Sequence, residues 1–120
     1  MIEQIQDLPA NVVGFRGTGK ITKNEYDSSL LPAVDMLADS TGSLRYLFVL
    51  DSDVSNISTG AWYDDIKVGL EHLLQWKKIA IVSDQKYVNK FTQVFGTVMP
   101  GEVRAFTLSE LDEAKKWVAE

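Results

Sequence analysis

The sequence predicts an α/β domain with a mainly parallel sheet, because short β-like runs alternate with segments of helical periodicity. Residues 44–50 form a continuous apolar run holding only Arg45 as a charge, which is typical of a strand covered on both faces. Residues 2–5 and 11–18 are β-like and flank a turn, so we expect a hairpin that makes one edge strand antiparallel. The full pattern predicts five strands and about four helices.

The first helix is expected to begin at Thr22, which with Glu25 three residues later forms a capping box. Apolar residues at helical spacing predict its buried stripe: Tyr26, Leu30, Val34 and Leu37. Pro32 lies inside this helix and removes a backbone donor, so we expect a kink near residues 28–31 or two shorter helices. Residues 39–42 should end it.

The second helix is expected over residues 59–76, with a core face of Trp62, Ile66, Leu70 and Leu73. A buried strand at residues 78–82 follows, and Asp84 is expected to cap a third helix that runs to residue 95. Residues 103–106 predict a last strand. Ser109 is expected to cap a final helix, with Asp112 at its third position.

Composition narrows the function classes. The chain has 120 residues, 45% of them hydrophobic and 24% charged, so we expect one globular domain over residues 1–120. Its net charge is −5 and its basic residues are scattered, which disfavours nucleic-acid and anionic-membrane binding. Cysteine is absent, and neither a secretory signal nor a transmembrane segment is visible, so a cytoplasmic location is expected.

Residues 14–21, GFRGTGKI, nearly match a phosphate-binding P-loop, with Gly14 and Gly19-Lys20 at the required spacing. The magnesium-binding hydroxyl position fails, because it holds Ile21 and Thr22 comes one residue late. The alternative is a strand whose glycines permit a bulge or a close backbone approach. Nucleotide binding by Gly14 to Lys20 is therefore the weakest of the functional hypotheses.

No catalytic, metal or cofactor site is predicted. The only histidine, His72, lies seven residues after Asp65, about 10 Å apart along a helix and too far for a direct hydrogen bond. Asp64 and Asp65 are adjacent and point in different directions, and both fit the first turn of a helix, where carboxylates stabilise the dipole.

Two groups of residues near the second helix could serve recognition. The hydroxyls of Ser58 and Thr59 precede the helix, where an added phosphate would meet free amides. Plain capping is the alternative interpretation. Large apolar side chains could form a ligand pocket or a dimer face, although ordinary core packing is the more usual role for most of them: Trp62, Trp76, Phe91, Phe95 and Met99. Tyr63 lies off the apolar stripe.

Several segments together resemble the SpoIIAA-like family of small bacterial proteins: NVVGFRGTGKIT, the Leu-Pro-Ala of the first helix, AWYDDIKVGLEHL, KIAIVSD, PGEVRAF and LDEAKKWV. The resemblance covers nearly the whole chain. It implies a SpoIIAA/STAS-like fold, a singly wound β/α superhelix, with a more distant relation to CRAL-TRIO lipid-binding domains. In the anti-sigma factor antagonists of this group, the turn before the second helix reads Asp-Ser-Ser-Gly, and the serine before the glycine is phosphorylated.

The matching segment here is Ile57-Ser58-Thr59-Gly60, so Thr59 falls at the phosphoacceptor position and Ile57 replaces the aspartate. The first functional hypothesis is a non-enzymatic STAS-like module that binds a protein partner or forms a homodimer through the second helix. Its candidate phosphoacceptor and contact residues are Ser58, Thr59, Gly60, Tyr63, Asp64 and Lys67. The second hypothesis is a carrier of an apolar or lipid-like small molecule.

Overall fold

The computed structural model describes residues 1–51, 74–85 and 101–120. Within them, one sheet has the strand order β1-β2-β3-β4-β5. The strands are β1 (Ile2–Gln4), β2 (Val13–Thr18), β3 (Leu44–Asp51), β4 (Trp76–Val82) and β5 (Glu102–Phe106). β1 pairs antiparallel with β2, and every later neighbouring pair is parallel. The predicted five-stranded sheet with one antiparallel edge strand is confirmed.

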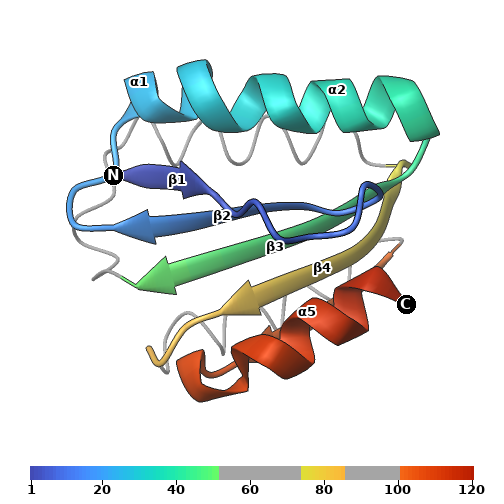
Figure 1. Cartoon of the computed structure of the whole chain (residues 1–120). Coiled ribbons are helices and arrows are strands. Elements are labelled where there is room, and N and C mark those ends of the chain that lie inside the picture. Colours follow the sequence, from blue (N-terminus) through green and yellow to red (C-terminus); the bar gives the residue numbers. More distant parts are fainter. Residues whose placement is uncertain (52–73, 86–100) are drawn as a thin grey trace.

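The described residues contain two helical segments, where the sequence predicted about four helices in the whole chain. The first comprises α1 (Lys23–Glu25), the π-helical turn η1 (Tyr26–Leu30) and α2 (Leu31–Thr41). The second comprises η3 (Leu108–Glu110) and α5 (Leu111–Ala119). Figure 1 shows α1 and α2 on one side of the sheet and α5 on the other. Most of the helix expected at residues 59–76 falls on residues 52–73, and most of the helix expected up to residue 95 falls on residues 86–100, outside those described.

The first helical segment follows the predicted pattern. Thr22 is its N-cap and accepts a hydrogen bond from the amide of Glu25. Pro32 stands at the start of α2, directly after the π-helical turn. In that turn the amide of Leu31 donates to the carbonyl of Tyr26, five residues back. The helix thus becomes irregular directly before Pro32, which has no amide to donate, and this is where a kink was expected. Gly42 ends α2 with a left-handed φ of 74°.

The core has two layers, one on each face of the sheet. β3 is buried along all its residues except the last, so it contributes to both layers. The layer beneath α2 contains Phe15, Leu30, Val34, Leu44, Tyr46 and Phe48 among others. The layer beneath α5 contains Leu47, Val49, Ala80, Val82, Ala114 and Val118 among others. The apolar run of the sequence therefore builds the central strand.

Two predicted boundaries are wrong. Trp76 was assigned to the end of the second helix, but it is the first residue of β4, which begins two residues earlier than expected. The last helical segment is capped by Thr107 rather than Ser109. The third helix that Asp84 was expected to cap lies outside the described residues, and the Asp84 carboxylate accepts a hydrogen bond from the amide of Leu108 at 2.8 Å.

Candidate functional site

The carboxyl ends of the parallel strands form one edge of the sheet, which is where open α/β sheets usually bind ligands and partners. β2 ends at Thr18, β3 at Asp51, β4 at Val82 and β5 at Phe106. Thr18 and Asp51 are Cα partners, and so are Val82 and Phe106. We call this row of strand ends the carboxyl edge.

An ion pair occupies the β2–β3 part of the carboxyl edge. The guanidinium of Arg16 donates to the carboxylate of Asp51 at 2.6 Å. Their side chains are 44% and 42% exposed, so water weakens the attraction and the pair adds little to stability. It is therefore a charged surface feature at the point where the chain leaves β3.

At the carboxyl end of β4, polar side chains form hydrogen bonds with nearby backbone groups. Ser83 is fully buried, and its Oγ accepts hydrogen bonds from the backbone and side-chain amides of Gln85 at 3.1 and 3.4 Å. Its own amide donates to the carbonyl of Phe106. The Asp84 carboxylate is engaged by Leu108. These groups fix the chain after β4 and the start of η3.

The start of the last helical segment is closed by a capping box between Thr107 and Glu110. The Thr107 amide donates to Glu110 Oε1 at 2.8 Å, and the Thr107 hydroxyl lies 3.0 Å from the same oxygen. These two bonds, in that order, lower the pKa of Glu110, and Arg104 nearby also lowers it. The carboxylate is therefore held in its charged form by the cap.

Because the pKa of Glu110 is lower in the folded chain, the capping contribution should be present above the unfolded value near 4.5 and lost as the pH falls through the folded value. We expect the wild-type chain to be more stable than a Glu110→Gln variant at neutral pH. The difference in the free energy of unfolding between the two proteins should become smaller in acid. Urea unfolding of both proteins from neutral pH downward measures it, and a gap that stays constant into strong acid would contradict the assignment.

The near-P-loop does not form a phosphate-binding loop. Gly14 and Gly17 lie inside β2, in register with β3. An added Cβ would come within 2.4 Å of a Leu8 methyl at Gly14, and within 2.7 Å of an Ile21 methyl at Gly17. These glycines therefore permit close packing, as the alternative interpretation held. Ile21 is fully buried at the position where a P-loop carries its hydroxyl.

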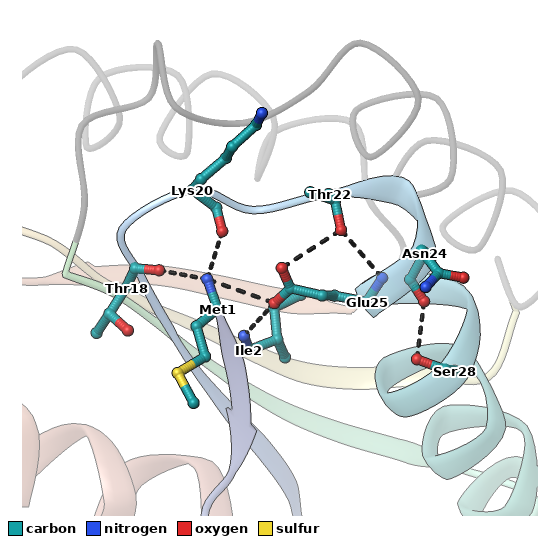
Figure 2. A network of polar contacts seen from close by, with 8 residues as sticks. All are labelled: Met1, Ile2, Thr18, Lys20, Thr22, Asn24, Glu25 and Ser28. Carbon is teal, nitrogen blue, oxygen red and sulfur yellow. Dashed lines mark hydrogen bonds and ion pairs between the residues drawn. The ribbon is translucent and has the colours of Figure 1, made fainter.

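A network of polar contacts joins the edge strand β1 to the start of α1 (Figure 2). The Glu25 carboxylate accepts a hydrogen bond from the Ile2 amide at 2.6 Å and lies 3.3 Å from the amino group of Met1. That amino group also donates to the carbonyls of Thr18 and Lys20. Glu25 also accepts a hydrogen bond from the Thr22 hydroxyl at 3.3 Å, but the backbone amide that its carboxylate binds is that of Ile2 in β1 and not that of Thr22, as a capping box would require.

We expect Glu25→Ala to lower the free energy of unfolding by about 1–2 kcal/mol, because a charge-assisted bond to a partly buried amide is lost. The matched control is Glu3→Ala, since Glu3 is an exposed carboxylate on the same strand as Ile2. Chemical denaturation of both variants measures the difference. Equal effects of the two substitutions would show that the network adds nothing.

At the opposite edge of the sheet, two cations hold the carboxyl end of α5. Arg45 on β3 and Lys78 on β4 are Cα partners. Arg45 is 7% exposed and donates to the carbonyl of Val118 at 2.8 Å, and Lys78 donates to that of Trp117 at 3.0 Å. Positive charge at a helix carboxyl end satisfies unpaired carbonyls and the helix dipole. Hydrogen bonds therefore hold both ends of the last helical segment: the capping box at its start, and Arg45 and Lys78 at the carboxyl end of α5.

Of the residues predicted to serve recognition or apolar ligand binding, only Trp76 is described. It is 7% exposed and packs edge-on against the Tyr46 ring, 5.9 Å between centroids, in the layer beneath α2. The others lie outside the described residues: Ser58, Thr59, Gly60, Trp62, Tyr63, Asp64, Lys67, Phe91, Phe95 and Met99. His72 and Asp65 also lie outside them.

Sequence reasoning missed the exposed pair of Arg16 and Asp51 and the contact of Asp84 with Leu108. Alternation along β2 could have placed Arg16 on the face opposite Phe15, but no local pattern names its partner 35 residues away. Within the described ranges, no set of three or more acidic or histidine side chains is arranged to hold a metal ion. None of the helices described there is both long and apolar enough to cross a bilayer.

Comparison with known proteins agrees with this architecture. The SpoIIAA-like family model matches residues 12–119. A crystal structure from Shewanella loihica PV-4, an uncharacterized protein of the DUF3478 family with a SpoIIAA-like fold, superposes with a TM-score of 0.72. The two are 24% identical, over 98% of this chain and 93% of that one, which shows a shared fold. The comparison with curated proteins gave no match. On the match over residues 12–119, the chain belongs to the SpoIIAA-like family.

Proposed function

We infer that the chain is a single non-enzymatic, STAS-like regulatory or interaction module that binds a protein partner or a second copy through the expected second helix, around residues 58–67. The observation that carries this proposal is the family membership over residues 12–119. Membership matters here because β3 ends at the carboxyl edge with Asp51, and the segment that corresponds to the antagonists' recognition turn, residues 57–60, begins six residues later in the sequence.

The described part of the carboxyl edge supports a recognition role over a chemical one. Ser83 is buried and accepts amide hydrogens, while Asp84 and Glu110 are occupied as helix caps. These side chains are therefore committed to structure. The exposed pair of Arg16 and Asp51 instead offers both charges to a polar partner surface next to residue 52.

The proposed contacts are Ser58, Thr59, Gly60, Tyr63, Asp64 and Lys67. A partner is first identified by cross-linking in the source cells and then purified for titration. We expect Lys67→Glu to weaken its binding at least about tenfold, the effect of a charge reversal within an interface. Lys116→Glu, the same change on an exposed position of α5, is the matched control. Equal affinities of the two variants would refute the proposed surface.

The switch version of this function requires phosphate on Ser58 or Thr59. Mass spectrometry of protein isolated from its own cells tests for it, and Ser58→Ala with Thr59→Ala should abolish both the modification and its effect on partner binding. Ser29→Ala, an exposed hydroxyl on η1, is the control. The carrier hypothesis receives no support from Trp76, because that side chain is packed into the core.

A further inference from the structure

The outer edge of β5 has the chemistry to pair with the same strand of a second copy. Within the described residues, β5 is the last strand of the sheet and pairs only with β4. Glu102 and Arg104 are exposed, whereas Val103 and Ala105 are partly buried. A free strand edge presents unpaired amides and carbonyls, so its side chains decide what it can accept.

The direction of the backbone groups follows from one hydrogen bond. The carbonyl of Phe106 accepts the amide of Ser83, so Phe106 directs its polar groups toward β4. Successive residues of a strand direct their backbone amides and carbonyls to alternate sides. The backbone groups of Arg104 and Glu102 therefore also point toward β4. Val103 and Ala105 direct their amides and carbonyls outward, away from the sheet.

The same alternation places the two charges on one face. Glu102 is the Cα partner of Lys78, whose side chain reaches α5, so Glu102 and Arg104 lie on the α5 face. The guanidinium of Arg104 lies over the rings of Phe106 and Trp117, at 4.9 and 5.4 Å from their centroids. Among the described strands, α5 packs mainly on β3 and β4, and its Trp117 reaches Phe106 of β5.

We propose that two copies of the chain associate by antiparallel pairing of β5 with β5, about a two-fold axis through Val103. In this register Val103 of one chain lies opposite Val103 of the other, and the two residues exchange two backbone hydrogen bonds. Glu102 of each copy then stands opposite Arg104 of the other, in the position where antiparallel side chains approach most closely. Both partners contribute the same surface, as a two-fold interface requires.

The other symmetric registers are less favourable. An axis through Glu102 sets two carboxylates opposite each other, and an axis through Arg104 sets two guanidinium groups opposite each other. An axis through Ala105 places Arg104 opposite Phe106 and leaves Glu102 without an opposite charge. Only the Val103 register sets Glu102 between two cations, Lys78 of its own chain and Arg104 of its partner. This association is argued from β5 alone and does not depend on the helix of the proposed function.

Sedimentation velocity of the full chain up to millimolar concentration tests the inference. We expect a weak dimer, because pairing of one short edge buries little area. Glu102→Arg and Arg104→Glu should each raise the dimer dissociation constant by about tenfold or more, since each turns both cross-strand attractions into repulsions. The double charge swap should restore association. Val103→Pro, which removes an outward amide without changing charge, should also weaken it.

Glu113→Arg is the matched control, because it makes the same charge change at an exposed site on α5. A wild-type chain that stays monomeric throughout would overturn the inference, and so would a dimer that is insensitive to Glu102→Arg or a double swap that fails to recover. A dimer broken by Lys67→Glu but not by Glu102→Arg would assign self-association to the expected second helix. Thermal unfolding of each variant checks that it folds.

Discussion

Replacing Arg45 by methionine should lower the free energy of unfolding by about 2–3 kcal/mol, the range for a buried hydrogen bond made by a charged group. Methionine keeps much of the apolar volume, but it leaves the carbonyl of Val118 without the donor that now lies 2.8 Å away. Arg45 is 7% exposed, so water does not readily replace the lost bond. Equilibrium denaturation in urea measures the change through its midpoint.

Arg16→Met is the matched control, because Arg16 lies on the adjacent strand β2 but is 44% exposed and paired with an exposed carboxylate. Its removal should cost less than about 1 kcal/mol. Hydrogen exchange adds a local readout, since loss of Arg45 should reduce protection in α5 more than in α2. Similar effects of the two substitutions would contradict the role given to the buried cation.

Patterns that depend on neighbouring residues predicted most of the described fold. The stripe of Tyr26, Leu30, Val34 and Leu37 is buried as expected, because helical spacing places these residues on one face. The apolar run of β3 became the central strand, since only a strand covered on both faces tolerates such a sequence. The irregular turn beside Pro32 followed from the missing proline donor.

The errors arose where two local solutions compete. Thr107 with Glu110 and Ser109 with Asp112 both have the spacing of a capping box. The longer glutamate side chain can reach back to the N-cap amide, and here it does so at 2.8 Å. Trp76 fits a helical stripe and a strand equally well, and its place in β4 follows from pairing with Leu44. Side-chain length decided the first case, and strand pairing decided the second.

The candidate site was less predictable than the fold, because its contacts join residues far apart in the chain. Arg45 stood out as the only charge in an apolar run, but its partner Val118 lies 73 residues away. Glu25 was predicted to close a local capping box and instead binds the Ile2 amide of β1. Spacing identifies groups that need partners, and only the packing of strands and helices identifies which partners they find.

Substituting Gly101 by alanine should destabilise the chain by about 1–3 kcal/mol, the usual cost of forcing extra atoms into a packed site. An added Cβ would lie 2.4 Å from the carbonyl oxygen of Trp76 and 3.1 Å from that of Lys77. Both atoms belong to the backbone of β4, so they cannot move aside without disturbing the strand pairing. The substitution should separate the start of β5 from β4.

Two other glycines distinguish this explanation from a general loss of glycine. At Gly14 the equally close atom is a side-chain methyl of Leu8, which can rotate away, so Gly14→Ala should cost less. At Gly19 nothing lies within 4 Å, but its φ of +56° disfavours alanine by about 1 kcal/mol. Thermal and urea unfolding of the three variants should rank Gly101→Ala as the most damaging. A smaller effect at Gly101 than at Gly14 or Gly19 would mean that the backbone of β4 can move aside where β5 begins, and would contradict the explanation by close backbone approach.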